Sequence, residues 1–315
     1  MVRPSGCRWS ALPLLALTLA VTGCPLIAGL DELPERAPIA TPVHRCDRLG
    51  KRGKAGEDGA LLDLILFADD TCVWMDDEEV TVGRYQEWLK TKAPDLAKTP
   101  LPPACSWKKE LSRPGVAPED ACVASIPKNE VDPLNGRKPV RCVDWCDALA
   151  YCTSYGRRLC FGDSFDVTLV PREEKDEWRL ACSLGDKLSF PTPGDAPGEC
   201  NTGQTADGGV GCRTDQTKGA QCGPSTTGTS PSCRPRADYP VDLSGNVREW
   251  IDLCSVSDAG APSRCQTRGG SYADTSTGSS CIALASVPRE TRDAQTGFRC
   301  CAALRPEEVG LIRGQ

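Results

Sequence analysis

The chain has 315 residues, a formal net charge of −6 and an aromatic content of 5%, and it contains 30 glycines and 26 prolines. Few aromatic side chains and many turn-forming residues predict a modest core with much irregular backbone. An acidic chain without a basic stripe lacks the electrostatic footprint of a nucleic-acid-binding protein, so we expect no nucleic acid partner.

The first residues have the pattern of an export signal. Arg3 and Arg8 precede an apolar run over residues 11–21. This run is too short to span a bilayer and has the length of the apolar region of a signal peptide. It ends in Val-Thr-Gly-Cys, which resembles the lipobox of bacterial lipoproteins. We therefore expect residues 1–23 to be a lipoprotein signal peptide and Cys24 to be lipidated. The alternative is an ordinary signal peptide with an incidental cysteine.

Lipidation predicts a location in the cell envelope. Removing residues 1–23 from 315 leaves 292 residues and, with the loss of Arg3 and Arg8, changes the net charge from −6 to −8. No later segment of the sequence is long and apolar enough to span a membrane, so the expected membrane contact is the lipid on Cys24. Pro25 is not the Asp that signals inner-membrane retention in enteric bacteria. This favours the outer membrane, with the protein periplasmic or surface-facing.

Cysteine usage agrees with an oxidising compartment. Without Cys7 and Cys24, the 20 cysteines become 18, an even number. In an exported chain we expect them to form disulfides, each worth about 2–4 kcal/mol. A zinc site is disfavoured because paired CxxC motifs are lacking and His44 is the only histidine. The adjacent cysteines at 300 and 301 should each bridge elsewhere, as should those at 142, 146 and 152; thiol or metal chemistry at these positions is the alternative.

The N-terminal half is expected to contain few regular elements. Residues 61–67 are the first strongly apolar segment, which forms a short strand or a helical turn. A compact domain is expected to begin near Cys72. Apolar side chains at helical spacing then predict a short helix over residues 82–89. Residues 90–135 are rich in proline and are expected to be irregular.

Two further helices are expected in the second half. Asp144 is the expected N-cap of a helix from Val143 to Tyr155. Another helix should run from about Arg172 to Leu184. Residues 189–240 have no periodicity and should be loop held by disulfides.

Several separated blocks stand in the order found in one known family. They are Trp74-Met75-Asp76 with Glu79-Val80-Thr81 and Tyr85; Pro139 to Trp145 with Asp147-Ala148 and Ala150-Tyr151-Cys152; Gly156-Arg157-Arg158-Leu159; Glu177-Trp178; Asp242 to Val247 with Glu249-Trp250; Arg268 to Tyr272; and Gly297-Phe298-Arg299. Through these blocks the chain resembles the formylglycine-generating enzyme family, also called the sulfatase-modifying factor family. An insertion at residues 161–170 departs from the family pattern.

The resemblance implies the fold class and the domain limits. It implies an α+β fold with little regular secondary structure, disulfide-rich and of the C-type-lectin-like formylglycine-generating enzyme type, over residues 72–303. A tether and N-terminal extension over residues 24–71 would precede this domain. A C-terminal tail over residues 304–315 would follow it.

The same resemblance implies a Ca²⁺ site, and oxygen ligands suit this hard cation. In the family the ligands are one early side chain, two backbone carbonyls and a glutamate. Carried over to this sequence, they are Asp242, Gly245, Val247 and Glu249. The alternative is that Gly245-Asn246 is simply a tight turn and that Glu249 is a solvated or salt-bridged acid.

A copper centre is not expected. The oxygen-dependent members bind Cu(I) with two cysteine thiolates, which suit this soft ion. These lie three and eight residues after the serine of the Gly-Gly bend, where this chain has Asp274 and Ser279. Cys281, two residues further on, is expected to form a disulfide with Cys300 or Cys301. Iron is not expected either, because one histidine cannot build the histidine–carboxylate cluster of iron-dependent members.

The first functional hypothesis is a binding or accessory lipoprotein of the cell envelope, with an unknown peptide, glycan or envelope component bound in a groove. The residues expected at this groove are Arg268, Gly269, Gly270, Ser271 and Tyr272. Arg248, where the family often has tryptophan, alters the neighbouring surface. The second hypothesis is a divergent protein-modifying oxidase of the same family that uses Cys281 with another thiol. A purely structural surface protein is the third.

Overall fold

The computed structural model describes residues 45–50, 52–99, 101–114, 121–125, 135–162, 175–203, 223–255 and 263–313. The predicted signal peptide, the lipidation site Cys24 and the tether up to residue 44 lie outside these residues, as does most of the 161–170 insertion. In the part of the chain that is described, no helix is long and apolar enough to cross a membrane.

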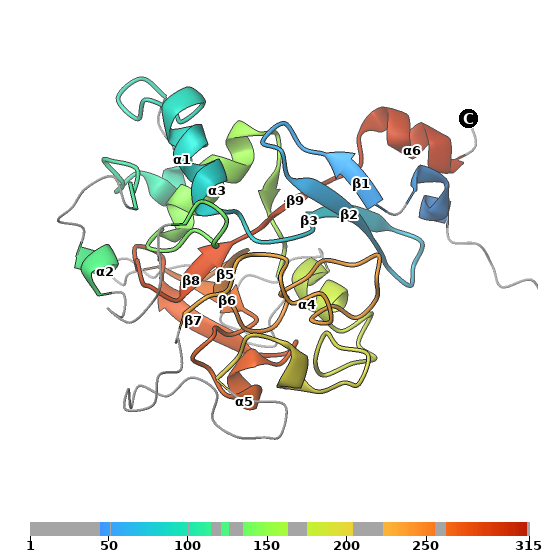
Figure 1. The fold of residues 1–315 in the computed structure, drawn as a ribbon. Helices are drawn as coiled ribbons and strands as arrows, with labels where there is room; N and C mark the ends of the chain where they lie inside the picture. The colour runs from blue at the N-terminus through green and yellow to red at the C-terminus, as the bar shows by residue number, and fades with distance from the viewer. Residues whose placement is uncertain are drawn as a thin grey trace, which may run out of the picture. The chain divides into compact units, whose positions relative to one another are not determined.

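The first sheet brings together strands that are far apart in the sequence (Figure 1). Its spatial order is β1 (Arg52–Ala55), β2 (Leu61–Leu66), β3 (Cys72–Asp76), β9 (Cys300–Ala302) and β4 (Arg158–Leu159), and the paired strands are antiparallel. The apolar segment at 61–67 is therefore a strand. Strands β1 and β2 also join this sheet, although they precede the predicted domain start near Cys72.

One face of the second sheet lines a groove. Its order is β7 (Leu284–Pro288), β6 (Arg264–Arg268), β5 (Arg248–Cys254) and β8 (Thr296–Phe298), and β5 runs parallel to β8. Trp250 is opposite Thr267, which is opposite Ala285. Because opposed side chains share a face and neighbours along a strand alternate, one face of this sheet collects every second residue of each strand.

The longer helices begin at capping residues that the sequence supplies. In α1 (Val82–Thr91) the Thr81 hydroxyl accepts from the Arg84 amide. In α3 (Trp145–Ser154) Asp144 and Asp147 form a reciprocal capping box. Both predicted helices are confirmed to within two residues at each end. The third, α4 (Glu177–Cys182), is shorter than expected because Asp176 caps it. The remaining helices are η1 (Arg45–Leu49), η2 (Pro103–Cys105), α2 (Ala121–Ala124), η3 (Pro197–Glu199), α5 (Ser276–Ser279) and α6 (Pro306–Arg313).

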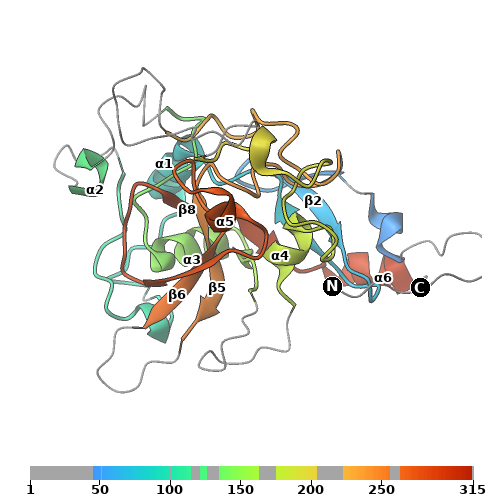
Figure 2. The same ribbon diagram turned by 90° about the horizontal axis from the view of Figure 1, so that it is seen from below.

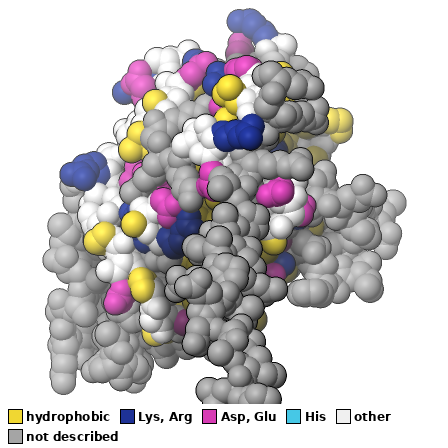
Figure 3. Space-filling view, turned by 90° about the vertical axis from the view of Figure 1, so that its right-hand side faces the viewer, with side chains coloured by type: hydrophobic (Ala, Val, Ile, Leu, Met, Phe, Trp, Pro, Cys, Tyr) yellow, Lys and Arg dark blue, Asp and Glu magenta, His cyan; other side chains and the backbone are white. Residues whose placement is uncertain are grey.

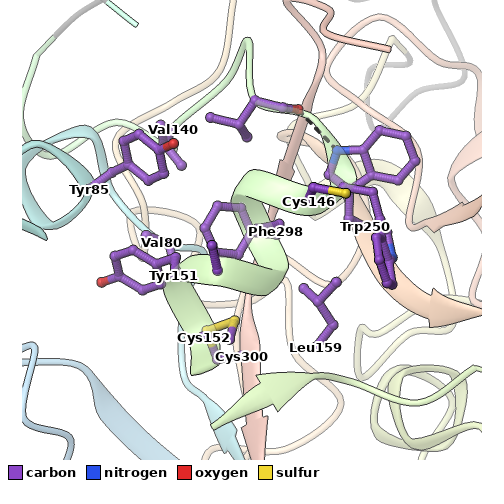
Figure 4. Packing of buried hydrophobic residues seen from close by; sticks show 14 of the residues in the cluster. Val80, Tyr85, Val140, Cys146, Tyr151, Cys152, Leu159, Trp250, Phe298 and Cys300 are labelled. Atoms are coloured by element: carbon purple, nitrogen blue, oxygen red, sulfur yellow. Dashed lines mark hydrogen bonds between the residues drawn. A yellow bond between two sulfur atoms is a disulfide. The ribbon is translucent and has the colours of Figure 1, made fainter. Parts of the chain in front are cut away.

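An aromatic cluster fills the core between α1, α3 and the second sheet (Figure 4). Tyr151 of α3 packs edge-on against Phe298 with ring centroids 5.4 Å apart, and Tyr85 of α1 stacks on Tyr151 at 6.0 Å. Trp250 of β5 is also buried here, and its ring nitrogen donates to the Val143 carbonyl oxygen at 3.1 Å. Other aromatic residues lie in separate clusters, Trp178 and Tyr239 in one and Trp74 in another.

The described residues contain eight disulfides, which confirms the disulfide-rich fold class. Adjacent cysteines bridge elsewhere, as predicted: Cys300 pairs with Cys152 and Cys301 with Cys160. The pairing expected for Cys281 is wrong, because Cys281 joins Cys182 of α4. Both cysteines of β9 are unavailable to Cys281 because they already form disulfides, one on each side of the strand.

The other five described bridges are Cys46–Cys72, Cys105–Cys146, Cys122–Cys142, Cys200–Cys233 and Cys254–Cys265. Cysteines 142, 146 and 152 therefore take part in three separate bridges, as expected. In residues 189–203 and 223–240 the structure has only the short η3, and the Cys200–Cys233 bridge joins the two stretches, which agrees with the predicted loop.

The face shown in Figure 3 mixes charges of both signs. Among its described side chains, basic and acidic groups alternate, and hydrophobic ones are scattered. This face has no large single-sign or apolar patch on its described part.

Candidate functional site

The predicted groove region begins at a bend after β6. Gly269 and Gly270 have φ angles of +84° and +64°, a conformation that favours glycine. A Cβ atom on Gly270 would lie 2.4 Å from the carbonyl oxygen of Gly278, so only glycine permits the backbone of α5 to approach this closely. The bend thus places α5 beside the face of the second sheet (Figure 2).

A groove of about 400 Å³ lies between α5 and the second sheet. Arg248, Thr267, Ala285, Val287 and Thr296 line it from all four strands, and they belong to the shared face that the register defines. The residues that line the other parts are Gly270, Asp274, Thr277, Gly278, Ala283, Leu284 and Asp293.

Most of the predicted groove residues do not line this groove. Among the five from Arg268 to Tyr272, Gly270 alone lines it. The Arg268 side chain is buried against Asp176 and donates to the Ile282 carbonyl oxygen at 3.0 Å. Tyr272 is 3% exposed. Ser271 is buried and holds Asp274.

An ion pair stands at the edge of this groove. The Arg248 guanidinium donates to one carboxylate oxygen of Asp274 at 2.8 Å. The other Asp274 oxygen accepts from the amide and the hydroxyl of Ser271, both at 2.7 Å. Asp274 is thus held by Ser271 on one side and paired with Arg248 on the other.

No thiol lies at the other two candidate positions. Ser279 is buried, and its hydroxyl donates to the Thr275 carbonyl oxygen at 3.0 Å. Cys281 is bridged to Cys182. All 16 cysteines within the described ranges are in disulfides; Cys212 and Cys222 lie outside these ranges. The described residues therefore offer no thiolate pair for copper.

The proposed calcium ligands lie in the tight segment that leads into β5. Asp242, Gly245 and Asn246 have positive φ angles of 59°, 75° and 54°. The carboxylate of Glu249, however, accepts from the Arg299 guanidinium through both oxygens, each at 2.7 Å. One of these oxygens also accepts from the Trp178 ring nitrogen at 2.7 Å.

In this arrangement the four residues do not fit a Ca²⁺ ion. Arg299 occupies the carboxylate edge that a cation would need, and Asp242 accepts from the Gly228 amide at 2.8 Å. Across the described part of the chain, no three His, Cys, Asp or Glu side chains group as a metal site would require. The geometry matches the salt-bridged alternative for Glu249, while the calcium site stays a prediction from the resemblance.

Burial shapes the electrostatics around this salt bridge. Burial raises the pKa of Asp242 to about 6. Burial and the neighbouring Asp242 raise the pKa of Glu79 well above its ordinary value. One Glu79 oxygen accepts from Asn246 at 2.9 Å, and the other has no hydrogen-bond partner within the described residues. Beside the Glu249–Arg299 ion pair, the pKa of two neighbouring acids is thus raised by burial.

Sequence reasoning missed two important residues of this region. Arg299 belongs to one of the blocks that carry the family resemblance. Its partner Glu249, however, is 50 positions away, and local spacing cannot predict such a contact. Thr267 gave no signal, because a threonine in a short strand is ordinary. The alternation of β5, β6 and β7 would have placed it in the groove if the register had been known.

Comparison with the solved structure of PvdO supports the fold. PvdO from Pseudomonas aeruginosa aligns with a TM-score of 0.52 and 17% identity over 81% of this chain and 98% of that one. CarF aligns at 0.46 with 16% identity over 74% and 87%. The Treponema denticola variable protein 1 aligns at 0.46 with 13% identity over 81% and 99%. Among curated proteins, no sequence match was found.

These findings define the class of domain as a disulfide-rich α+β fold of the formylglycine-generating enzyme type. A family model described as "Sulfatase-modifying factor enzyme 1-like domain" matches residues 71–304, and the chain belongs to this family.

Proposed function

We propose that this protein is an exported lipoprotein, anchored by a lipid on Cys24 to a membrane of the cell envelope, whose family domain binds a ligand in the groove between α5 and the second sheet. In this proposal the domain is a binding or accessory module and does not oxidise cysteine with copper. The outer membrane is favoured, with the groove on the periplasmic or external side.

One observation carries the binding proposal. The groove is open and lined by side chains of four strands, and the family resemblance implies that Asp274 and Ser279 replace the copper cysteines. Asp274 is engaged with Arg248, and Cys281 is engaged with Cys182. The site therefore retains a place for a ligand and lacks the soft donors that Cu(I) requires.

The alternative is a divergent oxidase of the family that uses Cys281 with a second thiol. It requires the Cys182–Cys281 bridge to open. Counting free thiols in the unreduced, denatured protein distinguishes the two functions: we expect none. Two free thiols with Cys281 among them, tight Cu(I) binding and oxidation of a thiol peptide would together establish the oxidase.

Ligand binding itself is tested by a screen with a blocked groove. Peptides and glycans are screened by thermal shift against the native protein and against Ala285→Trp, which fills the groove from β7. Ala303→Trp is the matched control, because Ala303 is exposed and is not among the groove residues. We expect hits that Ala285→Trp loses and Ala303→Trp keeps. A complete absence of hits would favour the purely structural role.

The anchor is tested separately. Cys24→Ser removes the sulfur that would carry the lipid. We expect this variant to move from the membrane fraction to the soluble fraction of the envelope, while the parent protein incorporates labelled fatty acid. Equal fractionation of both proteins would contradict the lipoprotein assignment.

A further inference from the structure

Arg248 presents unused hydrogen-bond donors in the groove. A guanidinium has five N–H donors. Among the described residues, the Arg248 side chain makes one hydrogen bond, to Asp274. Its side chain is 27% exposed, so the remaining donors are open to solvent or to a ligand.

The Thr267 hydroxyl is a second open group. Thr267 is 2% exposed and lines the groove, yet its hydroxyl has no hydrogen-bond partner within the described chain. A buried hydroxyl without a partner costs free energy, which a ligand atom that hydrogen-bonds to it would recover. The groove thus contains a buried polar group that its own residues leave unsatisfied.

The two acids of the groove have more of their hydrogen-bonding capacity occupied than its base, Arg248, has. Asp274 accepts from Ser271 and Arg248 through both oxygens. Asp293 accepts from the Gln295 amide at 2.6 Å and the Thr296 hydroxyl at 2.9 Å. The groove contains two acids and one base, but both acids already accept hydrogen bonds through both oxygens. The hydrogen-bonding capacity that remains is therefore mainly that of the charged Arg248 guanidinium. Such a donor pairs best with a carboxylate.

The opposite wall of the groove is apolar and belongs to an edge strand. Ala283, Leu284, Ala285 and Val287 line it from β7 and the residue before it, and β7 is at the end of the strand order. Leu284 is 37% exposed and the adjacent Ile282 is 70% exposed, and they are two of the four exposed large hydrophobic residues in the described ranges. An extended segment can run beside such an edge.

We propose that the groove binds an extended peptide that carries a carboxylate next to an apolar side chain. The carboxylate pairs with the free donors of Arg248, a polar ligand atom bonds to the Thr267 hydroxyl, and the apolar side chain lies on Ala285 and Val287, which share the groove face of β7. Arg248 then serves two carboxylates, that of Asp274 and that of the ligand. This proposal rests on the binding function proposed above and specifies its ligand.

The test uses four acetylated peptides: Ala-Ala-Leu with a free C-terminus, the same peptide as an amide, Ala-Asp-Leu amide and Ala-Lys-Leu amide. The dissociation constants are measured by NMR titration of the full mature protein in detergent. We expect a carboxylate peptide to bind about tenfold more tightly than the neutral amide, which corresponds to one charge-assisted contact. The free C-terminus and the aspartate peptide distinguish the two sources of the carboxylate.

Two variants identify the residues. Arg248→Gln should remove the preference for carboxylate. Asp274→Asn should increase affinity for the carboxylate peptide, because it removes the competing negative charge and can keep the hydrogen bonds from Ser271. Arg236→Gln is the control, because Arg236 makes a similar ion pair with Asp238 and does not line the groove. Melting curves check that each variant folds.

Three outcomes overturn the proposal. They are equal affinity for acid and amide, stronger binding of the lysine peptide with loss in Asp274→Asn, and no binding of any peptide at millimolar concentration. None of these decides the proposed function, since the thiol count and the Ala285→Trp screen test that function independently.

Discussion

Arg248 and Glu249 are neighbours in β5, yet their ion pairs have different surroundings. The Glu249 side chain is 1% exposed, and Arg299, its partner, is fully buried. The side chains of Arg248 and Asp274 are 27% and 23% exposed and border the groove. Strand alternation explains the difference, because consecutive side chains point to opposite faces. We infer that one pair is structural and the other is available to a ligand, and four measurements test this distinction.

Arg299→Leu should have the largest effect. It leaves Glu249 buried without its charge partner, and breaking a buried pair in this way costs about 3–5 kcal/mol. The free energy of unfolding is measured by urea denaturation. The double variant Arg299→Leu/Glu249→Leu should recover part of the loss, because the unpaired charge is gone. A loss below about 1 kcal/mol in the single variant would show that the pair is not structural.

Asp242→Asn should remove a pH dependence of stability. The pKa of Asp242 is about 6 in the folded protein, against an ordinary 3.8. The folded state therefore binds the proton of Asp242 more tightly than the unfolded state does. The stabilisation that this group contributes is complete below pH 3.8 and is lost as the pH rises towards 6. The change is about 3 kcal/mol, since one pKa unit is about 1.36 kcal/mol.

Unfolding free energies at pH 4 and pH 8 measure this effect. We expect the difference between the two pH values to shrink in Asp242→Asn, and asparagine tolerates the positive φ at this position. Asp95→Asn, on an exposed side chain, is the control. An unchanged pH profile in Asp242→Asn would show that Asp242 does not titrate differently in the two states.

Arg248→Gln should change stability by less than about 1 kcal/mol, because a partly exposed ion pair contributes little. Urea denaturation of this variant beside Arg299→Leu compares the two pairs under the same conditions. If both variants lose several kcal/mol, Arg248 is also structural, and its suggested role in ligand binding loses its basis.

Calcium should have the smallest effect. Because Arg299 already occupies Glu249, we expect the melting temperature to be the same in Ca²⁺ and in EGTA. A rise in Ca²⁺ that Glu249→Gln abolishes would restore the calcium site implied by the family resemblance. It would also show that Glu249 exchanges Arg299 for the ion.

The sequence predicted those parts of the fold that local chemistry controls. Asp144 caps α3 and apolar spacing marks α1, because caps and helical faces depend on residues a few positions apart. The family blocks supplied the fold class. The partner of Cys281 was mispredicted, because a disulfide depends on which distant elements meet, and sequence order does not contain that information.

The described groove adjoins the Gly-Gly bend that the sequence indicated, but most of its lining residues lie elsewhere in the chain. The Gly269-Gly270 bend indicated its position, because glycine permits positive φ and close backbone approach. Its wall comes from β7 and its buried hydroxyl from Thr267, which meet through strand register. Register in short strands depends on tertiary packing, so these residues became visible only in the structure.

The position of β9 between β3 and β4 has a consequence for biogenesis. Cys300 and Cys301 close bridges to residues 148 and 141 positions earlier. During synthesis, Cys152 and Cys160 therefore emerge as thiols long before their native partners do. Until residues 300 and 301 have been made, both thiols are open to mispairing with the other early cysteines, so their native bridges must form late or by rearrangement of earlier ones. The first sheet can be completed only at that stage.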